Sequence, residues 1–155
     1  MIVQIDTREK EKAIEKIQKT FEEKGIKTVS SKMYVGDYQN LQNGSVVVDR
    51  KQNLSEICSN VCQQHERFKA ELIRAQEAGI KIFILCEHGK DIKTIEDVKN
   101  WINPRLKKSP KALTGEKLYK IMKTQEERYG ITYLFCNKEE TGEKILEILG
   151  GNYEQ

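Results

Sequence analysis

Several features that define other protein classes are missing from this chain of 155 residues. It has only two prolines and no long polar linker, and its four cysteines include no C-x-x-C pair, so no disulfide framework is expected. No apolar run approaches the roughly 18–20 residues of a membrane span, and the first residues show no basic-then-apolar leader. We therefore expect one compact domain over residues 1–155 that is cytoplasmic and has no membrane partner.

The cysteines are interpreted as reduced and largely buried. Cys58, Cys62 and His65 fall on one face of an expected helix, which could indicate a soft-metal site. Only three such ligands are available locally, however, and the apolar stripe of Leu54 and Phe68 continues along the same face. Core packing is therefore the favoured interpretation.

The net positive charge of the chain is small, but basic residues are concentrated in one stretch. The formal net charge is only +3, whereas residues 105–123 contain a single acid among many basic residues. Pro104 and Pro110 bracket its first part, which predicts an exposed loop. Such a loop attracts phosphate backbones without reading sequence, although a merely solvated basic loop is the alternative. Its basic residues are Arg105, Lys107, Lys108, Lys111, Lys117, Lys120 and Lys123.

Apolar periodicity indicates strands that alternate with helices around a central hairpin. This order predicts an α/β fold with three layers, α/β/α, and a central mixed β-sheet. Trp101 is interpreted as a core residue or a lid anchor. The expected strands are 1–6, 26–31, 80–86 and 131–136, and the expected helices are 8–24, 53–78, 95–102, 116–129 and 138–149.

Two short segments on either side of the turn dipeptide Asn43-Gly44 concentrate the chemistry. Asp37 lies before the turn, and Asp49 and Lys51 lie after it. A β-hairpin would bring these three side chains together. Two carboxylates can hold a hard cation through oxygen, and the ammonium adds a proton-transfer or electrostatic role. The trio is a minimal set for phosphodiester hydrolysis with a divalent metal.

The register of this hairpin decides whether the trio forms. A two-residue loop would set Asp37 opposite Arg50, on the other face of the sheet from Asp49. A three-residue loop, 42–44, sets Asp37 directly across from Asp49. Gly44 then stands at the third loop position, where a left-handed backbone is needed. We therefore predict the three-residue loop.

Three blocks resemble the XPF-type nuclease domain of the PD-(D/E)XK superfamily. They are residues 5–9 (IDTRE), 35–38 (VGDY) and 48–51 (VDRK), and they occur in the family's order. The resemblance covers residues 1–90, the expected catalytic core. Residues 91–155 look similar to the C-terminal segment of compact bacterial and phage members. Within 155 residues there is no room for the tandem helix-hairpin-helix modules of larger members.

This resemblance implies a restriction-endonuclease-like fold and metal-dependent endonucleolytic cleavage of DNA, often at branched, flapped or forked structures. Asp37, Asp49 and the backbone carbonyl of Arg50 would hold Mg²⁺ or Mn²⁺, and Lys51 would assist the attacking water. Acidic positions of the same catalytic site are matched by Asp6 and Glu9. Supporting or DNA-binding positions are matched by Arg8, Arg50, Glu56 and Arg67, to which the basic loop adds Arg105, Lys107, Lys108 and Lys111.

The sequence departs from the family pattern at two of these positions. The usual glutamate is Asp49, one methylene shorter. The acid expected four residues after the lysine is replaced by Ser55, and the neighbouring Glu56 is carried over in its place. Arg67 is either a phosphate contact or an i,i+4 partner of Glu71.

Two other functions share the same scaffold and stay open. One is a non-catalytic DNA-binding module, and the other is a sequence-specific restriction-type nuclease. The oligomeric state is also open, with a homodimer as one option for engaging two strands. The sequence does not distinguish among repair, recombination and phage replication.

Overall fold

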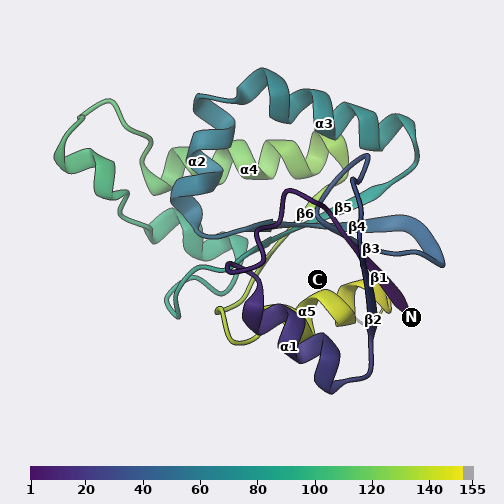
Figure 1. Cartoon of the computed structure of the whole chain (residues 1–155). Helices are drawn as coiled ribbons and strands as arrows, with labels where there is room; N and C mark the ends of the chain where they lie inside the picture. Colours follow the sequence, from purple (N-terminus) through teal and green to yellow (C-terminus); the bar gives the residue numbers. More distant parts are fainter. Residues whose placement is uncertain (152–155) are drawn as a thin grey trace.

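The computed structural model describes residues 1–151, which form a six-stranded sheet with helices on both faces (Figure 1). The strands are β1 (Ile2–Ile5), β2 (Lys27–Ser30), β3 (Tyr38–Asn40), β4 (Asn43–Lys51), β5 (Lys81–Cys86) and β6 (Thr132–Phe135). The α-helices are α1 (Glu15–Glu23), α2 (Leu54–Cys62), α3 (His65–Glu77), α4 (Gly115–Tyr129) and α5 (Thr141–Leu149). Two 3₁₀ helices, η1 (Ile95–Asn100) and η2 (Pro104–Lys107), precede α4.

The sheet is mixed, as the element order predicts. Its strand order is β2-β1-β3-β4-β5-β6. The central strand β3 runs antiparallel to both β1 and β4, while β1–β2, β4–β5 and β5–β6 are parallel pairs. The expected three-layer α/β/α architecture is confirmed, and β6 from the C-terminal part of the chain completes the same sheet.

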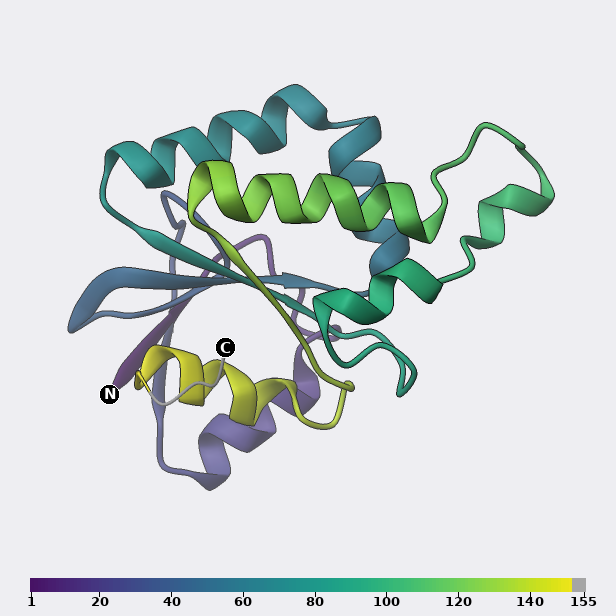
Figure 2. The same cartoon turned by 180° about the vertical axis from the view of Figure 1, so that it is seen from behind.

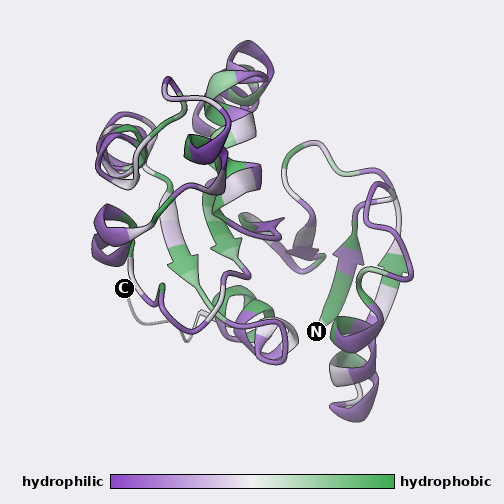
Figure 3. Cartoon of the chain, turned by 90° about the vertical axis from the view of Figure 1, so that its left-hand side faces the viewer, coloured by the Kyte–Doolittle hydropathy of each residue, from purple (hydrophilic) through white to green (hydrophobic). Residues whose placement is uncertain are grey.

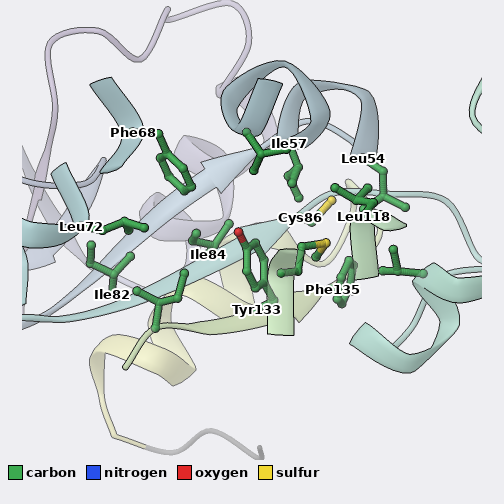
Figure 4. Packing of buried hydrophobic residues seen from close by; sticks show 14 of the residues in the cluster. Leu54, Ile57, Phe68, Leu72, Ile82, Ile84, Cys86, Leu118, Tyr133 and Phe135 are labelled. Atoms are coloured by element: carbon green, nitrogen blue, oxygen red, sulfur yellow. The ribbon is translucent and has the colours of Figure 1, made fainter. Parts of the chain in front are cut away.

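Two apolar clusters hold the layers together, one on each face of the sheet. On one face, α1 and α5 contribute Phe21 and Ile145 to a cluster with Tyr38 and Val48. On the other face, α2, α3 and α4 pack Leu54, Phe68, Leu72 and Leu118 against Ile82, Ile84 and Tyr133 (Figure 4). Trp101 is buried in this second cluster, which agrees with a core role. Apolar colour marks long parts of several strands, while the helices alternate between polar and apolar colour (Figure 3).

The register of the hairpin is as predicted, but its turn is not. Tyr38 pairs with Val48, which is the alignment that sets Asp37 level with Asp49. The turn lies at residues 41–42, because Asn40 pairs with Asn43, and a register shift between Gln39 and Asn40 restores the alignment. Gly44 lies within β4 and has no positive φ. An irregularity in the β-ladder, and not a left-handed glycine in the turn, therefore sets Asp37 level with Asp49.

Two helices differ from the sequence-based prediction. The helix expected over 8–24 begins only at Glu15, because residues 6–9 form a turn held by Asp6. The helix expected over 53–78 is two helices, α2 and α3, with a break at Gln63 and Gln64. Neither proline nor glycine marks this break, so the hydrophobic periodicity predicted one continuous helix.

The break also changes the environment of the cysteines. All four are free; Cys86 and Cys136 are buried and Cys58 is half-buried against the core. Cys62, at the last position of α2, is exposed, so the prediction of burial was wrong for this residue. His65 begins the next helix and does not share a helical face with the two cysteines. None of the helices within residues 1–151 has the length and apolar character needed to cross a bilayer.

Candidate active site

Strand β4 sends its charged residues to opposite faces of the sheet. Successive side chains of a strand alternate, so Val47 packs with α2, α3 and α4 while Val48 packs with α1 and α5. Asp49 and Lys51 therefore lie on the α2–α3 face, where Lys51 Nζ is 3.4 Å from Asp49 Oδ1. Arg50 lies between them in sequence and has its side chain on the other face. The predicted proximity of the carboxylate and the ammonium is confirmed.

Asp37 is brought to the same place by the backbone of Gly36. Gly36 has a φ of 75°, and a Cβ atom there would come within 3.0 Å of Val47 Cγ2. Only glycine combines this backbone angle with this closeness to β4. Asp37 then donates its backbone N–H to Val48 O at 2.8 Å, and its Oδ2 accepts the backbone N–H of Arg50 at 2.8 Å. Its carboxylate is thereby anchored beside Asp49.

Like charges crowd this end of the sheet. Burial raises the pKa of Asp37 well above its ordinary range, and the charges of Asp49 and Glu9 raise it further. Burial also raises the pKa of Glu71, again with Asp49 as the next contributor. The pKa of Lys51 is lowered by burial but raised more by Asp49, Glu56 and Asp37, so it stays above its ordinary value. Lys51 is therefore an ammonium within a group of acids.

Arg50 holds three parts of the chain together on the opposite face. Its Nε donates to Glu9 Oε2 at 2.7 Å and its Nη1 to Glu87 Oε1 at 2.5 Å. Glu9 also accepts the hydroxyl of Tyr38 at 2.7 Å, and Glu87 accepts the hydroxyl of Thr141 at 2.6 Å. All of these side chains are buried or nearly so. The network ties the β1–α1 turn, β4, β5 and the start of α5 to one another.

Asp6 has a different environment from the other acids of the site. Its Oδ1 accepts the backbone N–H of Met33 at 2.8 Å, and its Oδ2 accepts the Nε of Arg8 at 2.5 Å. Burial would raise the pKa of Asp6, but these hydrogen bonds and the charge of Arg8 outweigh it and lower the pKa. Asp6 does not line the cavity described next, so the structure places it beneath Arg8 rather than among the other acids.

An open cavity of about 470 Å³ lies over the trio, bounded by β4, α2, α3 and the β1–α1 turn. Glu56 and Arg67 line it, as do most of the sequence-predicted residues. Glu56 also accepts the backbone N–H of Gln52 at the start of α2. Arg67 has no ion pair with Glu71 among residues 1–151, which leaves its guanidinium available to a phosphate. The predicted site residues lining the cavity are Arg8, Glu9, Asp37, Asp49, Arg50, Lys51, Glu56 and Arg67.

The basic loop lies beside this cavity, not in it. The segment between η1 and α4 extends outward next to α2 (Figures 1 and 2). Arg105 and Lys111 line a hollow of about 340 Å³ against α2, and Ser59 borders both this hollow and the cavity over the trio. Lys107 and Lys108 are exposed but do not line either one. Two of the four predicted loop residues thus adjoin the site.

Sequence reasoning missed two acids of this region. Glu87 follows directly after the buried strand β5, the same signal that singled out Asp6 after β1, and it anchors Arg50. Glu71 stands one helical turn after Arg67, beside the apolar stripe of α3, and lines the cavity. It was considered only as an ion-pair partner, because its distance to β4 depends on how α3 packs.

The donor set at Asp37 and Asp49 fits a hard divalent cation. Two carboxylates lie side by side, with Lys51 beside Asp49 and the charge of Arg8 acting on Asp37. No group of three or more histidine, cysteine, aspartate or glutamate side chains within residues 1–151 is arranged to hold a metal ion. A cation at this place would need oxygen ligands beyond side chains.

Comparison with known proteins gives a family and a fold. Residues 5–148 match the ERCC4 domain. XPF from Aeropyrum pernix has a similar structure, with a TM-score of 0.65 and 19% sequence identity over 100% of this chain and 63% of that chain. XPF from Aeropyrum pernix in complex with DNA gives a TM-score of 0.66 and 19% identity over 96% of this chain and 63% of that chain. No curated protein sequence matches this chain.

Proposed function

The chain belongs to the ERCC4 domain family, and on this basis we propose that it is a divalent-metal-dependent endonuclease that hydrolyses phosphodiester bonds in DNA. Membership of this family and the XPF-like fold support a DNA nuclease. The chain spans about 63% of the length of the XPF structures that it matches, so their whole activity is not transferred to it. The observation that carries the proposal is the convergence of Asp37, Asp49 and Lys51 on one face of the sheet beneath an open cavity.

Mg²⁺ or Mn²⁺ is the cofactor that this donor set favours. Asp37, Asp49 and the backbone carbonyl of Arg50 would hold the ion, with solvent or phosphate oxygens completing its ligands. A bound divalent cation supplies Lewis-acid activation and neutralises charge on the phosphate. The crowding that raises the pKa of Asp37 is relieved when a cation binds, because the ionised form of the carboxylate is then favoured.

Lys51 acts as a cation and not as a base in this proposal. Its pKa is raised by the surrounding acids, so its ammonium keeps its proton at neutral pH. From 3.4 Å beside Asp49 it can donate a hydrogen bond to the attacking water or to a phosphate oxygen. The side chain is only 13% exposed, which strengthens this electrostatic effect.

Basic residues around the trio position it and contact the substrate in this proposal. Arg50, clamped by Glu9 and Glu87, fixes the backbone that carries the carbonyl ligand. Arg8 and Arg67 at the cavity wall, and Arg105 and Lys111 beyond Ser59, are placed to contact backbone phosphates. Such contacts carry no sequence information, so the proposed substrate is selected by shape, as a branch, flap or fork.

Cleavage of labelled DNA with Mg²⁺, against a control with EDTA, tests this function. The panel holds duplex, flap, fork and single-stranded substrates of one sequence, together with a second duplex of unrelated sequence. Metal-dependent cutting of the flap or fork supports the proposal. Binding without any cutting identifies a non-catalytic module, and cutting of one duplex sequence alone identifies a restriction-type nuclease.

Two further properties belong to the proposal. The free cysteines fit a reducing compartment, so the proposed enzyme acts in the cytoplasm. Two strands of a branched substrate are engaged most simply by a homodimer, which sedimentation with and without DNA would measure.

A further inference from the structure

A second hollow, of about 250 Å³, lies between α3 and α4 and has no part in the reaction described above. We call it the α3–α4 groove. Its apolar lining comes from Phe68 and Leu72 on α3 and from Ile121 and Tyr129 on α4. The two helices lie side by side over the same face of the sheet (Figures 1 and 2). The groove therefore opens on the outer surface of this helical layer.

Unpaired positive charge surrounds this apolar floor. Lys69, Lys120 and Arg128 line the groove and are exposed, and none has a carboxylate partner within salt-bridge distance among residues 1–151. The residues that line the groove include no aspartate or glutamate. Lys123, on the same helix, differs because it pairs with Glu126 at 3.4 Å. The groove thus presents cations to a ligand instead of neutralising them within the fold.

The groove adjoins the cavity over the trio at Phe68. This residue lines both the groove and the cavity over the trio, and its ring centroid is 5.5 Å from Lys51 Nζ. At the start of α3, Gln64 lines the cavity and the next residue, His65, lines the groove. A flexible chain that leaves the cavity across this end of α3 enters the groove directly.

We propose that the α3–α4 groove binds unpaired nucleotides of the DNA strand adjacent to the scissile phosphate. Bases that are not stacked in a duplex can pack against the half-buried Tyr129, while Lys69, Lys120 and Arg128 contact the phosphates of the same strand. A duplex keeps its bases inside and offers the groove only phosphates. The groove consequently favours substrates with a single-stranded arm. This inference rests on the proposed DNA-cleaving function and assigns one arm of its substrate to a surface.

Binding of two labelled DNAs in EDTA tests the proposal without cleavage. One DNA is a fork with single-stranded arms, and the other is a blunt duplex of the same sequence. The variant K69A/K120A/R128A should lose about tenfold to hundredfold in affinity for the fork and much less for the duplex. The slope of log K against log salt for the fork should fall by about 2, since each single-strand phosphate contact contributes roughly 0.7.

A control variant removes the same charge from α1, from the residue that follows it and from the edge strand β2, all away from the groove. It should change binding of both DNAs alike and only slightly, because its positions lie at α1 and β2, away from the groove. Thermal melting of both variants checks that each is folded. The control substitutions are K19A, K24A and K27A.

Photocrosslinking locates the bound strand without altering the protein. Single-stranded DNA with 5-iodouracil next to the cleavage position should crosslink to the peptide of α4 that contains Tyr129, which lines the groove and not the cavity over the trio. Crosslinks confined to other elements would overturn the proposal, as would equal losses for fork and duplex. A change of oligomeric state in the groove variant, with DNA binding intact, would assign the groove to a contact between copies of the chain and also overturn it.

The two proposals fail in different ways. If the wild-type protein cuts no DNA but crosslinks through the groove, the nuclease proposal fails and the groove assignment stands. If the wild-type protein cuts forked DNA while the groove variant binds and cuts it normally, the groove assignment fails alone.

Discussion

Two aspartates of this chain lie close to the same cavity in opposite electrostatic surroundings. Asp6, whose side chain is 0% exposed, is met by the N–H groups of Met33 and Arg8 and by the guanidinium of Arg8, and its pKa is lowered. Asp37 is met by the acids Asp49 and Glu9, and its pKa is raised. Burial raises the pKa of both aspartates; at Asp6 the hydrogen bonds and the charge of Arg8 outweigh it, whereas at Asp37 the charges of Asp49 and Glu9 add to it.

Asp6 and Asp37 represent two kinds of buried acid: one has its hydrogen-bond donors within the fold, and the other lies among acids. A buried carboxylate with enough donors stabilises the fold as it stands. A buried carboxylate beside other carboxylates is costly until a cation binds. We therefore infer that Asp6 stabilises the β1–α1 turn and that Asp37 is part of a cation site. The catalytic role predicted for Asp6 stays a prediction, and the variants below compare it with Asp37 directly.

Lys51→Ala should have the largest effect on activity, because it removes the ammonium that lies 3.4 Å from Asp49. We expect cleavage to fall by about 10²- to 10⁴-fold, below detection in an ordinary gel assay, with DNA binding nearly unchanged. The measurement is single-turnover cleavage of a forked duplex, with binding followed by anisotropy. Cutting at the wild-type rate would contradict the role of Lys51.

Asp6→Asn and Asp37→Asn should move stability in opposite directions at neutral pH in EDTA. Asp6→Asn weakens charge-assisted hydrogen bonds in a buried site, so the free energy of unfolding should fall by about 1–3 kcal/mol. Asp37→Asn removes one of several crowded charges, so the free energy of unfolding should stay equal or rise by about 1 kcal/mol. Urea unfolding of both variants measures this. Equal losses in the two would end the comparison.

The pH dependence of these differences has a defined sign. The unfolded aspartates have ordinary pKa values near 3.9. Asp37 has a raised pKa in the folded state, so its effect on stability is a loss that develops as the pH rises above about 4. Asp6 has a lowered pKa, so its contribution is present above about 4 and disappears as the pH falls through the folded value.

Melting temperatures from pH 3 to pH 8 in EDTA therefore check both aspartates. The gain of Asp37→Asn over the wild type should be present at pH 7 and vanish near pH 4. The deficit of Asp6→Asn should also shrink as the pH is lowered. A gain of Asp37→Asn that grows toward acid pH would show the wrong sign for a crowded carboxylate.

Arg8→Ala should have the smallest effect and sharpens the contrast. It removes one donor from Asp6 but leaves the backbone N–H groups, and the Arg8 side chain is 54% exposed. We expect a loss in stability of less than about 1 kcal/mol. Arg8→Lys serves as the matched control that keeps the charge without the guanidinium. A loss of DNA affinity with nearly unchanged stability would agree with the phosphate contact proposed for Arg8, whereas a stability loss as large as that of Asp6→Asn would contradict this prediction.

Much of the fold could be predicted because strong local patterns agree with it. The buried strands, the mixed sheet and the meeting of Asp49 with Lys51 follow from hydrophobic runs and strand alternation. The predicted position of the hairpin turn was wrong. Residues 41–42 form the turn, and an irregularity in the β-ladder that residue propensities do not predict restores the register. The break between α2 and α3 was missed because no helix-breaking residue marks it.

The site could be predicted where its residues belong to one hairpin or match positions of the family that the chain resembles, as Glu9 and Arg67 do. Asp37, Asp49 and Lys51 belong to one hairpin, whereas Glu87 and Glu71 reach the region from β5 and α3. Their positions depend on tertiary packing, which single-sequence patterns do not encode. Arg50 illustrates the same limit, because its motif left a supporting role and a phosphate contact open, and only the structure shows its side chain clamped between Glu9 and Glu87.

Cleavage of a forked duplex by Asp37→Asn, beside the wild type and with increasing Mg²⁺, tests the proposed centre most directly. The substitution keeps the side-chain shape and removes one of the two charges that would hold the ion. We predict metal-dependent cutting by the wild type and at least about a 10²-fold loss in a folded, DNA-binding variant. Cutting by Asp37→Asn at the wild-type rate and with the same Mg²⁺ dependence would contradict a cation held between Asp37 and Asp49.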